Sequence, residues 1–259
     1  MDYDTRKAWA EAVLSTEEWA IETIAARPQK GESAGCWVRS AQSKALGYLK
    51  PRKKSSGRFR AAYEKLASDF AFHLGVNVPP AVLWVRSTAP PAEEKCTAVS
   101  LVPQGELYEW SHFASVTNPA LKALLRNALK DGSDAPAFDA WMGNQDRGNL
   151  DNTLFAFDEE RPLFFLDFSN SMDFSGQWTA GDHLKFRRLG LPAMFKESLS
   201  RDATRGFAQK ILAFPDDKIR GLVSRIPHEF LPADVGEKTT KWLIERKNQL
   251  YARFDEWYP

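Results

Sequence analysis

The chain has 259 residues and a formal net charge of +1, with 27% charged residues, so neither sign dominates a surface and direct nucleic-acid binding is not expected. Hydrophobic residues make up 43%, including nine Trp and seventeen Phe, which is enough for a substantial core and excludes a disordered chain. The two cysteines, Cys36 and Cys96, have no metal-ligand spacing and form no disulfide framework, so we expect a cytoplasmic protein. No apolar run approaches the roughly 20 residues of a membrane span, and stable membrane insertion is not expected.

The first hundred residues are rich in predicted strands. Ser15 and Glu18 have capping-box spacing, so a helix could begin near Thr16, but the same segment also fits a strand. Short strands are predicted at residues 36–40, 45–51, 81–87 and 97–105. Residues 57–75 predict a helix, because aromatic and leucine side chains recur at helical spacing and Gly75 is placed to end it.

The pattern becomes helical after Gly105. Helices are predicted at residues 106–116, 118–132 and 133–143, the last with Ser133 or Asp134 as its N-cap and Pro136 near its first turn. Residues 152–157 and 162–168 then flank a polar turn and predict a hairpin, and the last ninety residues are mostly helical. We therefore predict an α+β fold with a strand-rich part, residues 1–104, and a helix-rich part, residues 105–259.

Three oxygen-bearing side chains mark the candidate site. Asp146 lies in the polar loop GNQDRGNLDN, Asn152 opens the first strand of the predicted hairpin, and Asp167 ends the second. Because a tight hairpin brings its strand ends together, Asn152 and Asp167 should be neighbours. Such a pair suits Mg²⁺, which takes few protein ligands and leaves room for phosphate. Asp146 could then orient a hydroxyl nucleophile, as phosphoryl transfer requires.

The segments NQDRGNLDN and LDFS resemble the catalytic loop and the metal-binding Asp of the protein-kinase-like superfamily, in particular HipA-like kinases and type II phosphatidylinositol 4-kinases. GYLKP is similar to the strand that carries the ATP-binding lysine, here Lys50, and AAYEKL to the helix whose glutamate pairs with it, here Glu64. AVSLVPQG resembles the hinge strand against which adenine lies, which implies contacts from Leu101 and Val102. GESAG corresponds to the phosphate-covering loop, with Ser33 as a candidate autophosphorylation site.

The resemblance implies a two-lobed protein-kinase-like fold with ATP and Mg²⁺ between a small β-rich lobe and a mainly helical lobe. Lys50, oriented by Glu64, would hold the α- and β-phosphates, and Asp146 would position the acceptor hydroxyl. Asn152 and Asp167 would hold Mg²⁺. The family usually places its Asn five residues after the catalytic Asp, whereas this chain has Asp151 at that position and Asn152 one residue later.

The acceptor has two candidate classes, and a third hypothesis involves no transfer. The HipA-like resemblance implies Ser or Thr of a protein substrate, a toxin role, and a small helix-turn-helix antitoxin as partner. The lipid-kinase resemblance implies phosphatidylinositol, although those enzymes carry a cysteine cluster that this chain lacks. A nucleotide-binding pseudokinase is the third hypothesis. Arg147, beside Asp146, is interpreted as structural, paired with a carboxylate near the loop.

Overall fold

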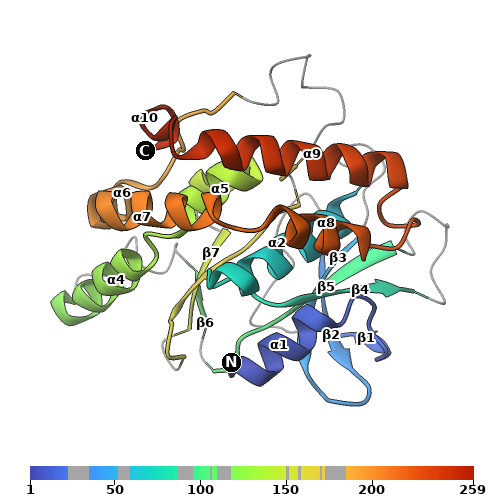
Figure 1. Ribbon diagram of the computed structural model, residues 1–259. Helices are drawn as coiled ribbons and strands as arrows, with labels where there is room; N and C mark the ends of the chain where they lie inside the picture. The colour runs from blue at the N-terminus through green and yellow to red at the C-terminus, as the bar shows by residue number, and fades with distance from the viewer. Residues whose placement is uncertain are drawn as a thin grey trace.

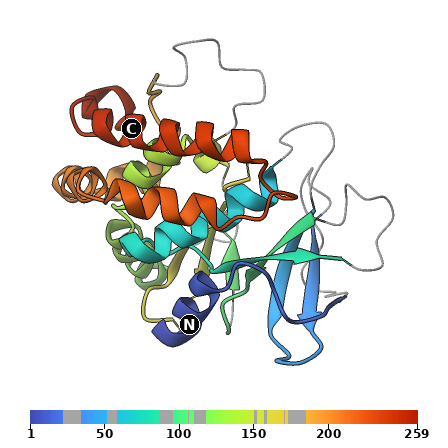
Figure 2. The same ribbon diagram turned by 45° about the vertical axis from the view of Figure 1, so that its right-hand side comes forward.

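The computed structural model describes residues 1–22, 35–51, 59–86, 96–105, 107–109, 118–149, 152–156, 159–169, 171–172 and 185–259. One end of the molecule is a twisted antiparallel sheet in the order β1-β2-β3-β5-β4 (Figure 2). Its strands are β1 (Trp19–Ile21), β2 (Cys36–Ser40), β3 (Leu46–Pro51), β4 (Ala81–Val85) and β5 (Cys96–Leu101). The strands predicted at residues 36–40, 45–51, 81–87 and 97–105 are therefore confirmed in type, although β4 ends at Val85 and β5 at Leu101.

The other end is mainly helical and contains a second, three-stranded sheet (Figure 1). That sheet is formed by β6 (Leu107–Glu109), β7 (Thr153–Ala156) and β8 (Leu163–Phe165). The helices of this end are α4 (Pro119–Asp131), α5 (Ala135–Met142), α6 (Ala193–Ser198), α7 (Arg201–Leu212), α8 (Asp216–Ser224), α9 (Ala233–Leu250) and α10 (Phe254–Trp257). The mixed α+β, two-part organisation predicted from the sequence is confirmed, whereas the boundary at residues 104 and 105 stays a prediction.

Helix α2 (Arg60–Leu74) lies between the five-stranded sheet and the C-terminal helices (Figure 2). Leu66 and Phe70 are fully buried and belong to a core that continues into α5, α7, α8 and α9. The helix ends as predicted at Gly75, whose φ of 76° is left-handed and suits a residue without a β-carbon. Because α2 is buried on nearly every side, its polar residues need partners inside the protein.

The N-terminal segment forms the strand, and not the helix near Thr16, of the two alternatives that the sequence left open. Helix α1 (Tyr3–Glu11) was not predicted; its N-cap is Asp2, whose side chain accepts a hydrogen bond from the backbone N–H of Thr5. Ser15 caps no helix, since its Oγ binds the backbone N–H of Glu17 and the indole N–H of Trp19. The strand alternative is the correct one, because Trp19–Ile21 pairs with β2.

The helix predicted at residues 106–116 is wrong at residues 107–109, which form strand β6. Leu107 pairs with Ala156 and Glu109 with Leu154, so β7 supplies the hydrogen bonds that an isolated helical turn would make locally. Asn118 caps α4, whereas Asp134 occupies the N-cap position of α5 without a side-chain capping bond. The predicted hairpin is present as β7 and β8, with Thr153 opposite Phe165.

Candidate active site

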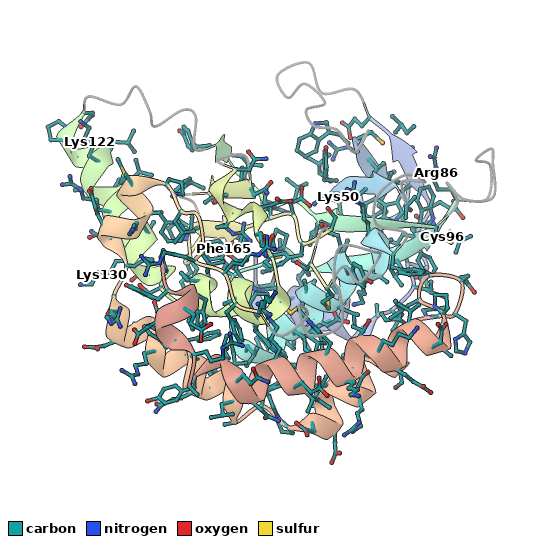
Figure 3. The ribbon with its side chains drawn as sticks, turned by 90° about the horizontal axis from the view of Figure 1, so that it is seen from above. Lys50, Arg86, Cys96, Lys122, Lys130 and Phe165 are labelled. Atoms are coloured by element: carbon teal, nitrogen blue, oxygen red, sulfur yellow. The ribbon has the colours of Figure 1, made fainter. Side chains whose placement is uncertain are left out.

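A cleft of about 220 Å³ lies between the two sheets. Figure 3 shows Lys50 on the side of the five-stranded sheet and Phe165 on the side of the helical part. One end is polar and the other apolar. The lining residues are Trp37, Tyr48, Lys50, Glu64, Val78, Pro79, Ser100, Leu101, Val102, Pro103, Asn149, Asn152, Leu154, Phe165, Leu166 and Asp167. Six of the eight residues proposed from the sequence, all except Asp146 and Ser33, therefore meet at this cleft.

Lys50, Glu64 and Asp167 form an ionic triad at the polar end. The Nζ atom of Lys50 lies 2.7 Å from Oε1 of Glu64 and 3.0 Å from Oδ1 of Asp167. Strand β3 supplies the lysine, α2 the glutamate, and the segment after β8 the aspartate, so the triad joins both parts of the molecule. Lys50 and Asp167 keep 12% and 29% of their side-chain surface exposed, which leaves them accessible to a ligand.

The pKa shifts within the triad differ between the two carboxylates. Burial alone would lower the pKa of Lys50, but the charges of Glu64 and Asp167 raise it above its ordinary value. Burial raises the pKa of Glu64, and the attraction of Lys50 opposes that shift. Burial would also raise the pKa of Asp167, but Lys50 and hydrogen bonds from Ser169 hold it far below its usual range. Of the two carboxylates, Asp167 is therefore the one whose ionised form is favoured.

Backbone geometry after β8 presents Asp167 to the cleft. Asp167 has a φ of 57°, a left-handed conformation that non-glycine residues seldom adopt. Its Oδ1 accepts a hydrogen bond of 2.5 Å from the hydroxyl of Ser169, and the N–H of Phe168 donates to Oε1 of Glu64 at 2.9 Å. The buried ring of Phe168 packs against Phe138 in α5. These contacts tie the unusual turn to α2 and to the core, which is where strained backbone is maintained.

The loop with Asp146 and Asn152 is held by its own hydrogen bonds. Asp146 begins a 3₁₀ turn, Asp146–Gly148, and its carbonyl oxygen accepts from Nδ2 of Asn152 at 3.0 Å. The carbonyl of Asn152 accepts from the N–H of Leu166, so the hairpin ends meet as expected. Asp146 is half-buried beside the cleft rather than in its lining, whereas Asn152 and Asn149 line it. With Nδ2 engaged, Oδ1 of Asn152 is the atom available to a cation.

A buried network beneath this loop was only partly anticipated. Arg147 is 1% exposed and donates to both oxygens of Asp139 at 2.8 and 3.0 Å, and it also donates to the carbonyls of Asn152 and Leu166. Asn144 bridges Asp139 and the N–H of Asp146. The structural interpretation of Arg147 is thus supported, with Asp139 as its carboxylate. A carboxylate in the apolar helix APAFDAWM was the sequence signal, because a buried charge requires a partner.

The apolar lining of the cleft includes the two predicted hinge residues and two aromatic residues that were not predicted. Leu101 and Val102 line the cleft beside Pro103. Trp37 and Tyr48 face each other across β2 and β3 with ring centroids 5.1 Å apart, and both also line it. Alternation along β3 could have identified Tyr48, since a residue two positions before Lys50 lies on the same face of the strand.

The donor set fits a magnesium ion with a bound nucleotide. An ionised Asp167 and the amide oxygen of Asn152 are hard oxygen ligands, and Mg²⁺ commonly uses one or two protein ligands together with phosphates and water. Within the described ranges, no group of three or more His, Cys, Asp or Glu side chains gathers as a self-sufficient metal cage. Ser33 and Asp151 fall outside the residues that the structure describes. Among the helices that it does describe, none combines the length and apolar character needed to span a membrane.

Comparison with solved structures identifies the architecture. The chain is similar to the Helicobacter pylori proinflammatory kinase CtkA, with a TM-score of 0.61 and 15% identity over 95% of this chain and 99% of that one. A second structure, WaaP in complex with acyl carrier protein, gives a TM-score of 0.39 and 16% identity over 96% and 92% of the two chains. No protein-family model and no curated protein sequence matches the chain. The first likeness shows that this chain has a protein-kinase-like fold.

Proposed function

We propose that the protein is a kinase that transfers the γ-phosphate of ATP, with Mg²⁺, to a hydroxyl group of a protein serine or threonine. The observation that carries the proposal is the Lys50–Glu64–Asp167 triad at the polar end of a cleft whose other end is apolar. Phosphoryl transfer depends on positioning and on charge stabilisation, and this arrangement offers both. The apolar end suits a nucleobase, and the polar end suits the phosphates.

Each residue has a defined task in this reaction. Lys50 would bind the α- and β-phosphates, while Glu64 orients its ammonium group. Asn152 and Asp167 would hold Mg²⁺, which when bound would neutralise charge on the phosphate oxygens. Asp146 would accept the proton of the acceptor hydroxyl as the new oxygen–phosphorus bond forms and the bond between the γ-phosphorus and the bridging oxygen of ADP breaks. Arg147, anchored on Asp139, would keep Asp146 and Asn152 in register.

The choice of a protein over a lipid acceptor rests on the cysteines. Both cysteines, Cys36 and Cys96, are buried, so neither resembles the exposed lipidated cluster expected of a lipid kinase of this superfamily. A protein acceptor is therefore proposed ahead of phosphatidylinositol. A toxin role with a small helix-turn-helix antitoxin is part of the same proposal, and a neighbouring gene for such a partner would support it.

The test combines nucleotide binding with transfer. Purified protein is incubated with labelled ATP and Mg²⁺, with and without phosphatidylinositol vesicles, beside Asp146→Asn and Asp167→Ala variants. Asp146→Asn should bind Mg·ATP normally and transfer nothing, whereas Asp167→Ala should bind Mg·ATP weakly, because Asp167, unlike Asp146, would be a ligand of the metal. Lipid labelling without protein labelling would reverse the acceptor assignment. The mechanism would be overturned if the affinity for ATP were the same with and without Mg²⁺, or if Asp146→Asn kept full turnover.

A further inference from the structure

Beside the catalytic loop lies a basic segment with no role in the triad. A β-carbon placed on Gly148 would lie 3.0 Å from the carbonyl oxygen of Gly190, so the two backbones touch. Gly148 ends the 3₁₀ turn that Asp146 begins, and Gly190 follows the sequence KFRRL at residues 185–189. This contact places residues 185–190 next to the position that an acceptor hydroxyl would occupy.

Two buried anchors fix the direction of the segment. Phe186 is 7% exposed and lies under the guanidinium of Arg246, which is 4.1 Å from its ring centroid. Leu189 is equally buried, and its N–H donates to the carbonyl of Trp257. The intervening side chains, Arg187 and Arg188, are both exposed. The two apolar side chains are therefore buried against the rest of the protein, and the two arginine side chains remain on the surface.

Neither arginine forms an ion pair with an acidic group of the described part of the chain. Among the residues that the structure describes, no carboxylate lies within ion-pair distance of Arg187 or Arg188. The nearby helix α10 carries Asp255 and Glu256, but these pair with Arg201 and Arg253. The positive potential of the segment is therefore available to an incoming anionic group.

We infer that Arg187 and Arg188 select acceptor peptides with acidic residues close to the phosphorylated serine or threonine; this rests on the proposed kinase function. Arg188 is two residues from Gly190, and Asp146 is two residues from Gly148, each a span of at most about 7 Å. An extended peptide advances about 3.3 Å per residue, so a carboxylate two to four positions from the acceptor falls within reach of the segment. Arginine also offers a fork of donors that matches a carboxylate.

The inference is tested with three peptides that share one serine and differ in their flanking residues, which are glutamate, alanine or lysine. Labelled peptides are titrated into the full chain and followed by anisotropy, and phosphorylation is measured in parallel. The wild type should favour the glutamate peptide over the alanine peptide by about 5- to 10-fold, the size expected for two exposed charge pairs, and the preference should shrink at high salt. Arg187→Gln/Arg188→Gln should bring the ratio near one, and Arg187→Glu/Arg188→Glu should favour the lysine peptide.

A matched control separates this effect from a general loss of positive charge. Lys218→Gln/Arg220→Gln removes two exposed cations from α8, away from the catalytic loop, and should leave the preference unchanged. Equal use of all three peptides by the wild type would overturn the inference while leaving the kinase proposal intact. Selective binding of the glutamate peptide without phosphorylation would support the role of the two arginines in peptide recognition and overturn the kinase proposal. If the arginine variants instead lose binding to vesicles with anionic lipid and keep their peptide preference, the segment is a membrane contact and the inference fails.

Discussion

Two ionic clusters lie on different sides of helix α2 and begin at consecutive residues. Glu64 faces the cleft and meets Lys50 and Asp167, whereas Lys65 faces helix α1 and meets Asp69 at 2.7 Å. In the second cluster Lys65 and Asp69 are both 0% exposed, and the remaining contacts go to the carbonyl of Trp9 and to Arg225. We call these the cleft cluster and the rear cluster. The cleft cluster is open at one side, while the rear cluster is closed.

The pKa values express the same difference. Asp167 is held ionised because its lysine and Ser169 outweigh the effect of partial burial. Burial dominates at Asp69 and raises its pKa to about 6, even though Lys65 and Arg225 oppose the shift. Similar chemistry thus gives a charge that can act on a ligand in one place and a costly internal contact in the other. Exposure, more than residue type, distinguishes the cleft cluster from the rear cluster.

The largest expected effect is the loss of activity when the cleft cluster is broken. Lys50→Met should lower kcat/KM on the order of 100- to 1000-fold, because it removes the charge that we propose binds the α- and β-phosphates of ATP. Its stability should change little, since Asp167 remains partly solvated and Glu64, whose pKa is already raised by burial, can take up a proton. Steady-state kinetics and thermal melting of the same preparation measure both. If Lys50→Met also lowered the melting temperature strongly, the cleft cluster would have a structural role instead.

The rear cluster should show the opposite balance. Lys65→Met leaves Asp69 buried with only Arg225, at 3.5 Å, as a charged partner, and should cost about 3 kcal/mol of unfolding free energy. Activity per folded molecule should stay near that of the wild type. Lys238→Met, which breaks an exposed pair with Asp234, is the matched control and should change little. Unaltered stability of Lys65→Met would show that the buried pair contributes nothing to the fold.

The sequence predicted the cleft cluster and missed the rear cluster for a physical reason. Lys50, Glu64 and Asp167 stand at the ends or faces of strongly patterned elements, and their order resembles that of a superfamily. Lys65 and Asp69 have the spacing of an ordinary exposed helical pair, and nothing local signals that α1 covers them. Burial of a helix on every side is a tertiary property that periodicity does not encode.

Two further misses have the same origin. Residues 107–109 have helical periodicity, but the edge of β7 makes them a strand. Asp139 appears as one polar residue in an apolar helix, and its role emerges only when Arg147 folds back from the next loop. Positions decided by local signals, such as the end of α2 at Gly75 and the hairpin before Asp167, were correct.

A smaller effect, pH dependence, tests the rear cluster directly. The ordinary pKa of an aspartate is 3.8, so between pH 3.8 and about 6 the folded protein retains a proton on Asp69 that the unfolded chain has lost. The free energy of unfolding should therefore fall as pH rises through this window, by up to about 3 kcal/mol relative to Asp69→Asn. Urea denaturation of both proteins from pH 4 to 7 measures the difference. A difference that grows with pH would mean that Lys65 and Arg225 lower the pKa instead.

The smallest effect is expected at Asn152, which lines the same cleft as Asp167 but does not belong to the cleft cluster. Its side chain lines the cleft and its Nδ2 binds the carbonyl of Asp146, so Asn152→Ala removes both a candidate metal ligand and a loop contact. We expect a loss of about 10- to 100-fold in kcat/KM, equivalent to about 1.4 to 2.8 kcal/mol, and a higher Mg²⁺ requirement. Asn152→Asp separates the two roles, because it keeps an oxygen ligand and loses the Nδ2 hydrogen-bond donor. Its Mg²⁺ requirement should be close to that of the wild type. Asp151→Ala should cost little, because Asn152 already lines the cleft and can supply the oxygen ligand. If Asp151→Ala is instead the more damaging substitution, then Asp151 is the metal ligand and the usual five-residue spacing from Asp146 is kept.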